Sequence, residues 1–376
     1  MSNPTLLQVD LAAINHNLDE ARRLAGGRLV LAAVKADAYG HGIVEVSRSI
    51  EASGSADWLG VATVDEGLWL REAGIGLPIL KFSPTLADEE AAVAAGITLA
   101  VGDEKSIRRI SVAADAVGRI ADVHLKTDTG MHRFGAAPEE ATGLAELIDS
   151  LPAIRLTGLF THLPVSDVPD GVEFTRTQLD RFLVLAAGIR ERTPLELIVH
   201  AANSGAVLSH DLTGTDMVRP GIMVYGSYPD ALTPRTADLW PTERWTSRLT
   251  FVEHVKAGES VGYGRTWVAP QDTWVGTVAV GYGDGYSRLL SSRGRMLIDG
   301  VSYPIVGRVC MDQTMIDLGP ELAAQVGDEV VLVGASGKER ITVAELAEAM
   351  GTIPYEVTCL ITHRVPRTYV SRPHDH

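Results

Sequence analysis

Eight apolar, β-like runs alternate with amphipathic, helix-like segments over the first two-thirds of the chain, and this repeat constrains the fold most strongly. The first run is LVLAAVK at residues 29–35, and the last is DMVRPGIMVYG at residues 216–226. Because the runs are continuous rather than alternating, their strands are predicted to be parallel and buried on both faces. Eight such units within about 220 residues favour an α/β fold, a (β/α)8 TIM-type barrel, over an open sheet.

The pattern changes after Tyr228, where a proline-rich, aperiodic stretch predicts a linker. Short β-like runs separated by glycine-rich turns follow it, and they predict a small, mainly β domain. The expected division is a barrel over residues 10–235 and a β-rich domain over residues 236–376. The N-terminal run TLLQVD precedes the first barrel unit, so a strand within residues 1–9 is expected to join the C-terminal domain.

Composition narrows the possible partners and location. The chain has 33 basic and 48 acidic residues, a net charge of −15, which argues against nucleic acid or an anionic membrane as a main partner. Two cysteines in 376 residues make no disulfide framework. The start lacks a signal-peptide pattern, and no apolar run approaches the ~20 residues of a membrane span. A cytoplasmic location is expected.

Cationic and hydrogen-bonding residues follow several predicted barrel strands. In such barrels the active site lies at the C-terminal ends of the strands. The residues at these positions are Lys35, Tyr39, Lys126, Asp128, Arg133, His162, His200, Asn203, Ser204, Arg219, Gly221, Ile222 and Tyr225. Any single residue of this set is most simply explained as a strand end that reaches solvent. The concentration of so many on one rim of the barrel indicates an active site.

Two of these features favour a particular chemistry. The loops ANSGA and RPGIM follow the seventh and eighth strands, where barrels of this kind commonly bind phosphate. Lys35 ends the first strand, and a lysine shielded from water can act as a neutral nucleophile. A Schiff-base lysine opposite a phosphate site indicates either pyridoxal phosphate or an aldolase-type substrate. The histidines show no metal-binding spacing, so no metal is expected.

Eight motifs along the chain resemble those of the alanine racemases in order and spacing. They are AVKADAYGHG, KTDTGMHRFG, HAANSGA, RPGIMVYG, VGYGRTW, VGYGDGYSR, GRVCMDQ and PYEVTC, and they cover both predicted domains. The resemblance implies a pyridoxal 5'-phosphate enzyme that interconverts L- and D-alanine, a peptidoglycan precursor. It also implies a head-to-tail homodimer with shared active sites.

The same resemblance implies roles for individual residues. Lys35 would carry the cofactor as a Schiff base and act as one base, and Tyr263 of the partner subunit would act as the other. The implied cofactor-binding residues are Lys35, Tyr39, His162, Asn203, Ser204, Arg219, Gly221, Ile222 and Tyr355. Arg219 would face the pyridine nitrogen, and His162 would link it to the second base.

The substrate carboxylate would be bound by Arg133 and by the backbone of Met311. Tyr282 would line the substrate entry. In many family members the lysine at the position of Lys126 is carbamylated, which makes the same modification possible here.

The resemblance also leaves alternatives open. The segments THLPVSD and LKFSPT depart from the usual family pattern, and neither includes the proposed bases. A related decarboxylase would need a nearby acid, for which Cys310 is a candidate. A non-catalytic pyridoxal-phosphate carrier would lack the β domain. A racemase of serine, or of a broader range of amino acids, would keep the same catalytic residues.

Overall fold

The computed structural model of the chain describes residues 4–192 and 196–371. The outermost residues of the predicted first and last segments, 1–3 and 372–376, lie outside this description. The described chain separates into two compact units. The barrel unit comprises Ile14–Ala38 and Gly42–Trp240. The β unit takes the segment up to Ala13, the short segment Tyr39–His41 and the segment from Pro241 onward.

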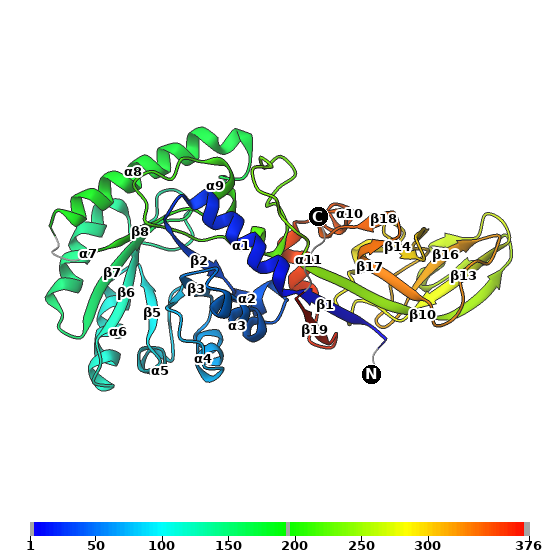
Figure 1. Cartoon of the computed structure of the whole chain (residues 1–376), viewed down its shortest axis with the longest axis horizontal. Helices are drawn as coiled ribbons and strands as arrows, with labels where there is room; N and C mark the ends of the chain where they lie inside the picture. Colours follow the sequence, from blue (N-terminus) through cyan, green and yellow to red (C-terminus); the bar gives the residue numbers. More distant parts are fainter. Residues whose placement is uncertain (1–3, 193–195, 372–376) are drawn as a thin grey trace. The chain divides into compact units, whose positions relative to one another are not determined.

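Eight parallel strands close the barrel, in the order of the sequence (Figure 1). They are β2 (Leu29–Ala33), β3 (Trp58–Val61), β4 (Ile79–Lys81), β5 (Ile97–Val101), β6 (Ala121–Lys126), β7 (Ile154–Phe160), β8 (Ile198–His200) and β9 (Met217–Val218). The strand β9 pairs with β2 to complete the ring. The predicted TIM-type barrel is therefore confirmed.

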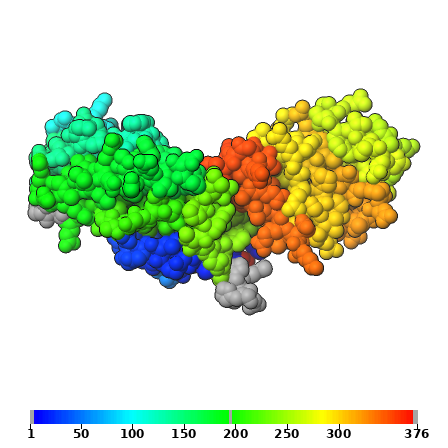
Figure 2. All heavy atoms as spheres, turned by 90° about the horizontal axis from the view of Figure 1, so that it is seen from above, coloured from blue at the N-terminus to red at the C-terminus, as the bar shows by residue number. Residues whose placement is uncertain are grey.

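Helices accompany the barrel strands, and some of them begin at sequence signals typical of helix starts. They are α1 (Leu11–Ala25), α3 (Ile43–Ser53), α4 (Val64–Glu72), α5 (Glu89–Ala94), α6 (Glu104–Ala116), α7 (Pro138–Ser150), α8 (Val172–Arg190) and α9 (Ser204–Ser209). Thr63 and Glu66 form a capping box on α4, and Asp103 caps α6. Figure 2 shows the segment that includes α8 on the surface of the barrel unit.

The interior of the barrel is packed with side chains from different strands. Leu31, Leu80 and Met217 are fully buried against one another, although they belong to β2, β4 and β9. Phe82 packs against this cluster from the segment after β4. Such layers of apolar side chains are what makes this barrel a core rather than a pore.

The β unit is built around a sheet in which the N-terminal strand is internal. The strand β1 (Leu6–Asp10) pairs antiparallel with β10 (Glu243–Val255) and parallel with β19 (Arg367–Val370). The sheet also contains β13 (Thr273–Val278), β14 (Arg295–Ile298), β15 (Val301–Pro304), β16 (Thr314–Gly319), β17 (Glu329–Ser336) and β18 (Glu339–Ile341). The mainly β character predicted for this part of the chain is confirmed.

Smaller elements complete the β unit. They are the pair β11 (Ser260–Val261) and β12 (Trp267–Val268), with α10 (Val343–Met350) and α11 (Pro354–Leu360). A cluster of Val255, Ala269, Val275 and Val306 forms one apolar centre of this unit. Within the described residues, no helix combines the length and apolar character needed to cross a membrane.

Candidate active site

Lys35 begins a left-handed turn directly after the first barrel strand. It is half-buried and opens α2 (Lys35–Tyr39). The four residues after it, 36–39, have φ of 53–54°. Each L-residue in this conformation costs roughly 1–2 kcal/mol, so surrounding contacts must hold the turn. The Ala38 N–H donates to Val34 O at 2.8 Å, which closes the turn on the strand.

Glu66 anchors this turn from the neighbouring helix, and its role was not predicted from the sequence. Its carboxylate accepts the Ala36 N–H at 2.6 Å and also the N–H groups of Ala62 and Thr63. The capping-box pattern T-x-x-E predicts the bond to Thr63. The bond to Ala36 depends on how β2 and β3 pair, which no local signal in the sequence reveals. One buried carboxylate thus joins the start of α4 to the lysine turn.

Arg219 lies fully enclosed after β9 and uses its guanidinium as a hub. It donates to Thr161 O at 2.8 Å, to Ala201 O at 2.9 Å and to His200 Nδ1 at 2.8 Å. Burial, and then the charge of Arg133, lower the Arg219 pKa to about 9. The group therefore remains a cation at neutral pH.

A chain of two buried histidines extends from Arg219 and has a defined proton arrangement. Arginine only donates, so His200 Nδ1 accepts and His200 Nε2 carries the proton. That proton is donated to His124 Nδ1 at 2.8 Å. Because His124 Nδ1 accepts, the single ring proton of neutral His124 is on Nε2. Burial and the charge of Arg219 lower the His124 pKa to about 3, and the same causes lower the His200 pKa far below its usual value. Both rings are neutral.

Gly158 on β7 leaves the space that the His124 ring occupies. A Cβ atom at this position would lie 2.7 Å from the ring. Neither His124 nor Gly158 is among the residues predicted from the sequence, because both lie within strands rather than at their ends. The relevant signal would have been a histidine inside an otherwise apolar β-like run.

His162 follows β7 and is surrounded by positive charge. Its Nδ1 lies 3.3 Å from the Arg219 guanidinium and accepts from it, so the remaining proton of the neutral ring is on Nε2. Burial lowers the His162 pKa well below its usual value, and the charges of Arg219, Arg133, Lys35 and Lys126 lower it further. Four cations are therefore close enough to act on one imidazole, in a chain whose net charge is −15.

Lys126 and Arg133 contribute two of these cations from the segment at and after β6. Lys126 is buried and donates to Phe134 O. Burial lowers the Lys126 pKa to about 8. Arg133 is exposed, in a loop that Asp128 shapes by accepting the N–H groups of Gly130 and His132. The loop thus presents a cation to solvent beside a buried amine.

The loops after β8 and β9 bind each other through Ser204. Its Oγ accepts the Gly221 N–H at 2.8 Å, and Ile222, which follows, is completely buried. Asn203 caps α9 by accepting the Ala206 N–H, and it donates to Leu163 O. Its side chain therefore holds the loop in shape. The two loops are thereby joined into one buried unit.

The remaining predicted site residues belong to the β unit. Tyr39 is buried, with its ring centre 6.0 Å from that of Tyr355 in α11. Burial, and then Tyr355, raise the Tyr39 pKa well above its usual value. Gly40 fits against α11 so closely that a Cβ would lie 2.3 Å from Thr358 O. Both tyrosines therefore belong to one packed cluster.

Three further residues of the β unit are unusually exposed for their size. Tyr263 is 72% exposed, Met311 is 54% exposed and Tyr282 is 42% exposed. Met311 and Tyr282 lie on adjacent segments, because the Tyr282 N–H donates to Cys310 O and the Gly283 N–H donates to Met311 O. These side chains are available to a partner rather than used in the core.

The fold and this geometry define a class: a (β/α)8 barrel with a β domain, carrying a rim lysine, an arginine–histidine network and small-residue loops after β8 and β9. The alanine racemase N-terminal domain family matches residues 9–229, and the C-terminal domain family matches residues 242–369. The chain therefore belongs to the alanine racemase family, whose members are isomerases.

Individual relatives match over nearly the full length. Alanine racemase of Cutibacterium acnes is 50% identical over 98% of this chain and 99% of its own, and that of Chlorobaculum tepidum is 42% identical over 96% and 94%. Among solved structures, alanine racemase of Clostridium difficile 630 has a TM-score of 0.92 at 33% identity, covering 99% of this chain and 97% of its own. The enzyme from D-cycloserine-producing Streptomyces lavendulae has a TM-score of 0.92 at 34% identity, covering 99% and 98%.

Proposed function

We propose that this protein interconverts L- and D-alanine with pyridoxal 5'-phosphate as its cofactor. The observation that carries the proposal is the group of four cations around a neutral His162 in an acidic protein. A phosphate and a substrate carboxylate are the anions that such a site would bind. The names of the relatives and the match to both family domains support alanine as the substrate.

The residues present fit this cofactor. Lys35 would supply the amine for covalent attachment, and the loops joined by Ser204 and Gly221 would supply donors for the phosphate. Ile222 and Asn203 belong to the same loops, and Tyr39 and Tyr355 are the further phosphate ligands that the resemblance implies. When bound, the cofactor withdraws the electrons left on the alanine α-carbon after its proton is removed.

Racemisation requires one base on each face of the α-carbon. We assign Lys35 to one face and Tyr263 of the partner subunit to the other. A tyrosine oxygen is a useful base only when its anion is stabilised. His162 suits that task, because its Nδ1 accepts from Arg219 and its Nε2–H is left to donate. Arg219 keeps a positive charge at the other end of this hydrogen-bonded chain.

Arg133 and the Met311 backbone are proposed to bind the substrate carboxylate. Arg133 is exposed, and its charge lowers the pKa values of Arg219 and His162, which supports a place close to both. Carbamylation of Lys126 requires a neutral amine, and a pKa of about 8 provides a substantial neutral fraction near physiological pH. The exposed Tyr263, Met311 and Tyr282 support a homodimer with shared sites. A cytoplasmic location stays a prediction from the sequence.

Incubation of the purified holoenzyme with single enantiomers in deuterated water tests the proposal. L-Alanine or D-alanine should lose optical rotation while gaining deuterium at the α-carbon. L-Serine and L-lysine define the substrate range in parallel incubations. Constant rotation with all three amino acids would refute racemisation, and release of carbon dioxide would instead support the decarboxylase alternative.

A further inference from the structure

Lys81 is a buried lysine on the outer side of the barrel wall. It ends β4 within the segment LKFSPT, which departs from the family pattern. Its neighbours Leu80 and Phe82 pack into the barrel interior, so the alternation of a strand directs Lys81 toward the helices instead. It is only 4% exposed. This amine is therefore separated by the barrel wall from the interior cluster.

The Lys81 ammonium has no carboxylate partner within salt-bridge distance among the described residues. It donates to Ser83 O and Pro84 O, both at 2.9 Å. One of its three N–H groups is therefore left to donate to a ligand. The nearby carboxylates of Glu66 and Glu89 are engaged elsewhere, with backbone N–H groups and with Arg109. Burial lowers the Lys81 pKa to about 8, and the charges of Glu89 and Glu66 partly oppose this shift. A buried cation whose nearby carboxylates are bound to other groups is incompletely neutralised, so this position favours an anionic ligand.

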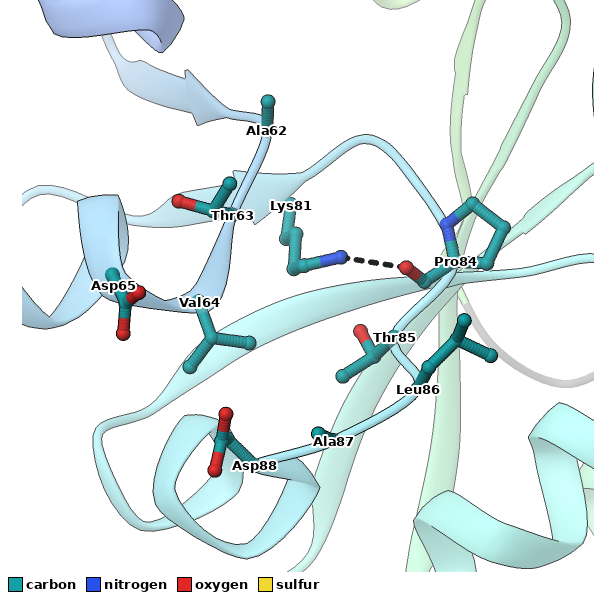
Figure 3. A pocket seen from close by; sticks show the side chains of 10 residues that line it. All are labelled: Ala62, Thr63, Val64, Asp65, Lys81, Pro84, Thr85, Leu86, Ala87 and Asp88. Carbon is teal, nitrogen blue, oxygen red and sulfur yellow. Dashed lines mark hydrogen bonds between the residues drawn. The ribbon is translucent and has the colours of Figure 1, made fainter.

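A cavity of about 280 Å³ lies beside this amine (Figure 3). It is lined by Ala62, Thr63, Val64, Asp65, Lys81, Pro84, Thr85, Leu86, Ala87 and Asp88. Thr85 is 2% exposed, and its hydroxyl has no hydrogen-bond partner within the described chain. The first turn of α4 also borders the cavity, and the N–H groups of a helix start favour negative charge. Two side-chain donors, the Lys81 ammonium and the Thr85 hydroxyl, thus line one small space beside a helix start.

The outer part of the same cavity has the opposite charge. Asp65 and Asp88 line it and are exposed, whereas Lys81 and Thr85 are buried. A simple anion would be attracted by the inner wall but repelled by these carboxylates. A dipolar molecule, with its carboxylate inward and its cation outward, satisfies both. The apolar side chains of Val64 and Leu86 also line the cavity, where they can contact a short aliphatic group of the ligand.

We propose that this cavity binds a small α-amino acid as a zwitterion. The carboxylate would accept from Lys81 and Thr85, and the ammonium would lie beside Asp65 or Asp88. The site is built entirely from one stretch of the barrel unit, so it does not depend on the proposed racemase reaction. It would give the protein an amino-acid site additional to the catalytic one.

Lysine-selective NMR of the holoenzyme tests this site directly. The chain has six lysines, so a protein labelled with 13C at the lysine ε-carbon gives few signals. Lys81→Met identifies the Lys81 signal by its loss. Glycine should shift that signal in a saturable manner, and propionate, which lacks the ammonium, should bind up to about fivefold more weakly. The Lys35 signal reports separately on the catalytic site.

Two matched variants distinguish the proposed contacts. Thr85→Val should weaken glycine binding by about three- to tenfold, as expected for one lost hydrogen bond. The double change Asp65→Asn with Asp88→Asn should remove the preference for glycine over propionate. An unmoved Lys81 signal near the solubility limit of glycine would refute the site. Equal binding of propionate and glycine to the unchanged protein would refute an amino acid as its ligand.

Discussion

Arg219 is a donor-only side chain at the position proposed to face the cofactor ring nitrogen. Its hydrogen bonds to two carbonyl oxygens and His200 hold it as a cation. A cation at this place would leave the ring nitrogen unprotonated, which weakens electron withdrawal and shortens the lifetime of the substrate carbanion. We infer that this arrangement limits side reactions such as transamination.

Replacing Arg219 by glutamate should therefore change the reaction outcome. Racemisation should fall by about 10²–10³-fold, as for the loss of one preorganised donor, while transamination rises relative to racemisation. The measurement is the ratio of pyruvate formed to optical rotation lost. Arg219→Lys, which keeps a cation, serves as the matched control. An unchanged ratio in the glutamate variant would contradict the inference.

The lowered pKa of His124 predicts that the free energy of unfolding depends on pH. Its pKa is about 3 in the folded protein and near 6.5 in the unfolded chain, so unfolding takes up a proton below pH 6.5. The stability that it contributes is present above pH 6.5 and is lost as the pH falls. Between pH 7 and pH 5 this one residue should lower the free energy of unfolding by about 2 kcal/mol.

Urea unfolding of the wild-type protein and of His124→Gln at both pH values measures this effect. Glutamine offers an oxygen that can accept from His200 but does not titrate. The pH dependence should therefore be smaller in the variant by about 2 kcal/mol. Identical pH dependence in the two proteins would mean that His124 is not held neutral.

Site residues at strand ends could be predicted from the sequence, whereas residues whose role depends on packing could not. Lys35, His162 and Arg219 were found because barrel chemistry concentrates where strands end. Glu66 and His124 were missed, because a capping glutamate and a histidine within a strand look ordinary until the neighbouring strands are paired. Binding roles assigned through the resemblance stay predictions.

The left-handed turn after β2 is the element that most directly positions Lys35. Its four consecutive positive-φ residues are held in part by the Glu66 carboxylate. Glu66→Gln removes the charge and replaces one acceptor oxygen by a donor. We expect a loss of about 1.5–3 kcal/mol in stability, since these hydrogen bonds involve an ionised group. Retention of pyridoxal phosphate during dialysis should also fall.

Glu72→Gln provides the control for this change, because Glu72 ends the same helix and is exposed. It should leave both the unfolding midpoint and the dialysis result unchanged. If Glu66→Gln behaved like Glu72→Gln, the turn would not depend on Glu66.

At the scale of elements, hydrophobic periodicity was sufficient to predict the barrel. The strands β2–β9 correspond to the eight continuous apolar runs, since strands buried on both faces need no polar positions. The left-handed turn was not predicted, because Ala36, Asp37 and Ala38 have no intrinsic preference for that conformation strong enough to reveal it. The grouping of Tyr39–His41 with the β unit likewise depends on a contact with α11.

At the scale of the whole molecule, the proposed shared site makes a prediction about mixed dimers. Lys35→Ala and Tyr263→Phe chains should each be inactive alone. When subunits exchange at random, half of the dimers are mixed, and each mixed dimer holds one intact site and one doubly altered site. The mixture should therefore recover about a quarter of the wild-type activity.

Subunit exchange is checked by labelling the two chains with different affinity tags and isolating the dimers that carry both. These dimers should have about half of the wild-type activity. Inactive dimers carrying both tags would show that Lys35 and Tyr263 do not act across a shared site.

The position of β1 has a consequence for synthesis of the protein on the ribosome. This strand is synthesised before the barrel strands, yet both of its sheet neighbours, β10 and β19, lie far along the chain. Its pairing with residues 367–370 must wait until those residues have been synthesised. The nascent chain therefore carries an unpaired strand of alternating buried residues while the barrel is being synthesised, and chaperones that recognise such segments have that whole interval in which to bind.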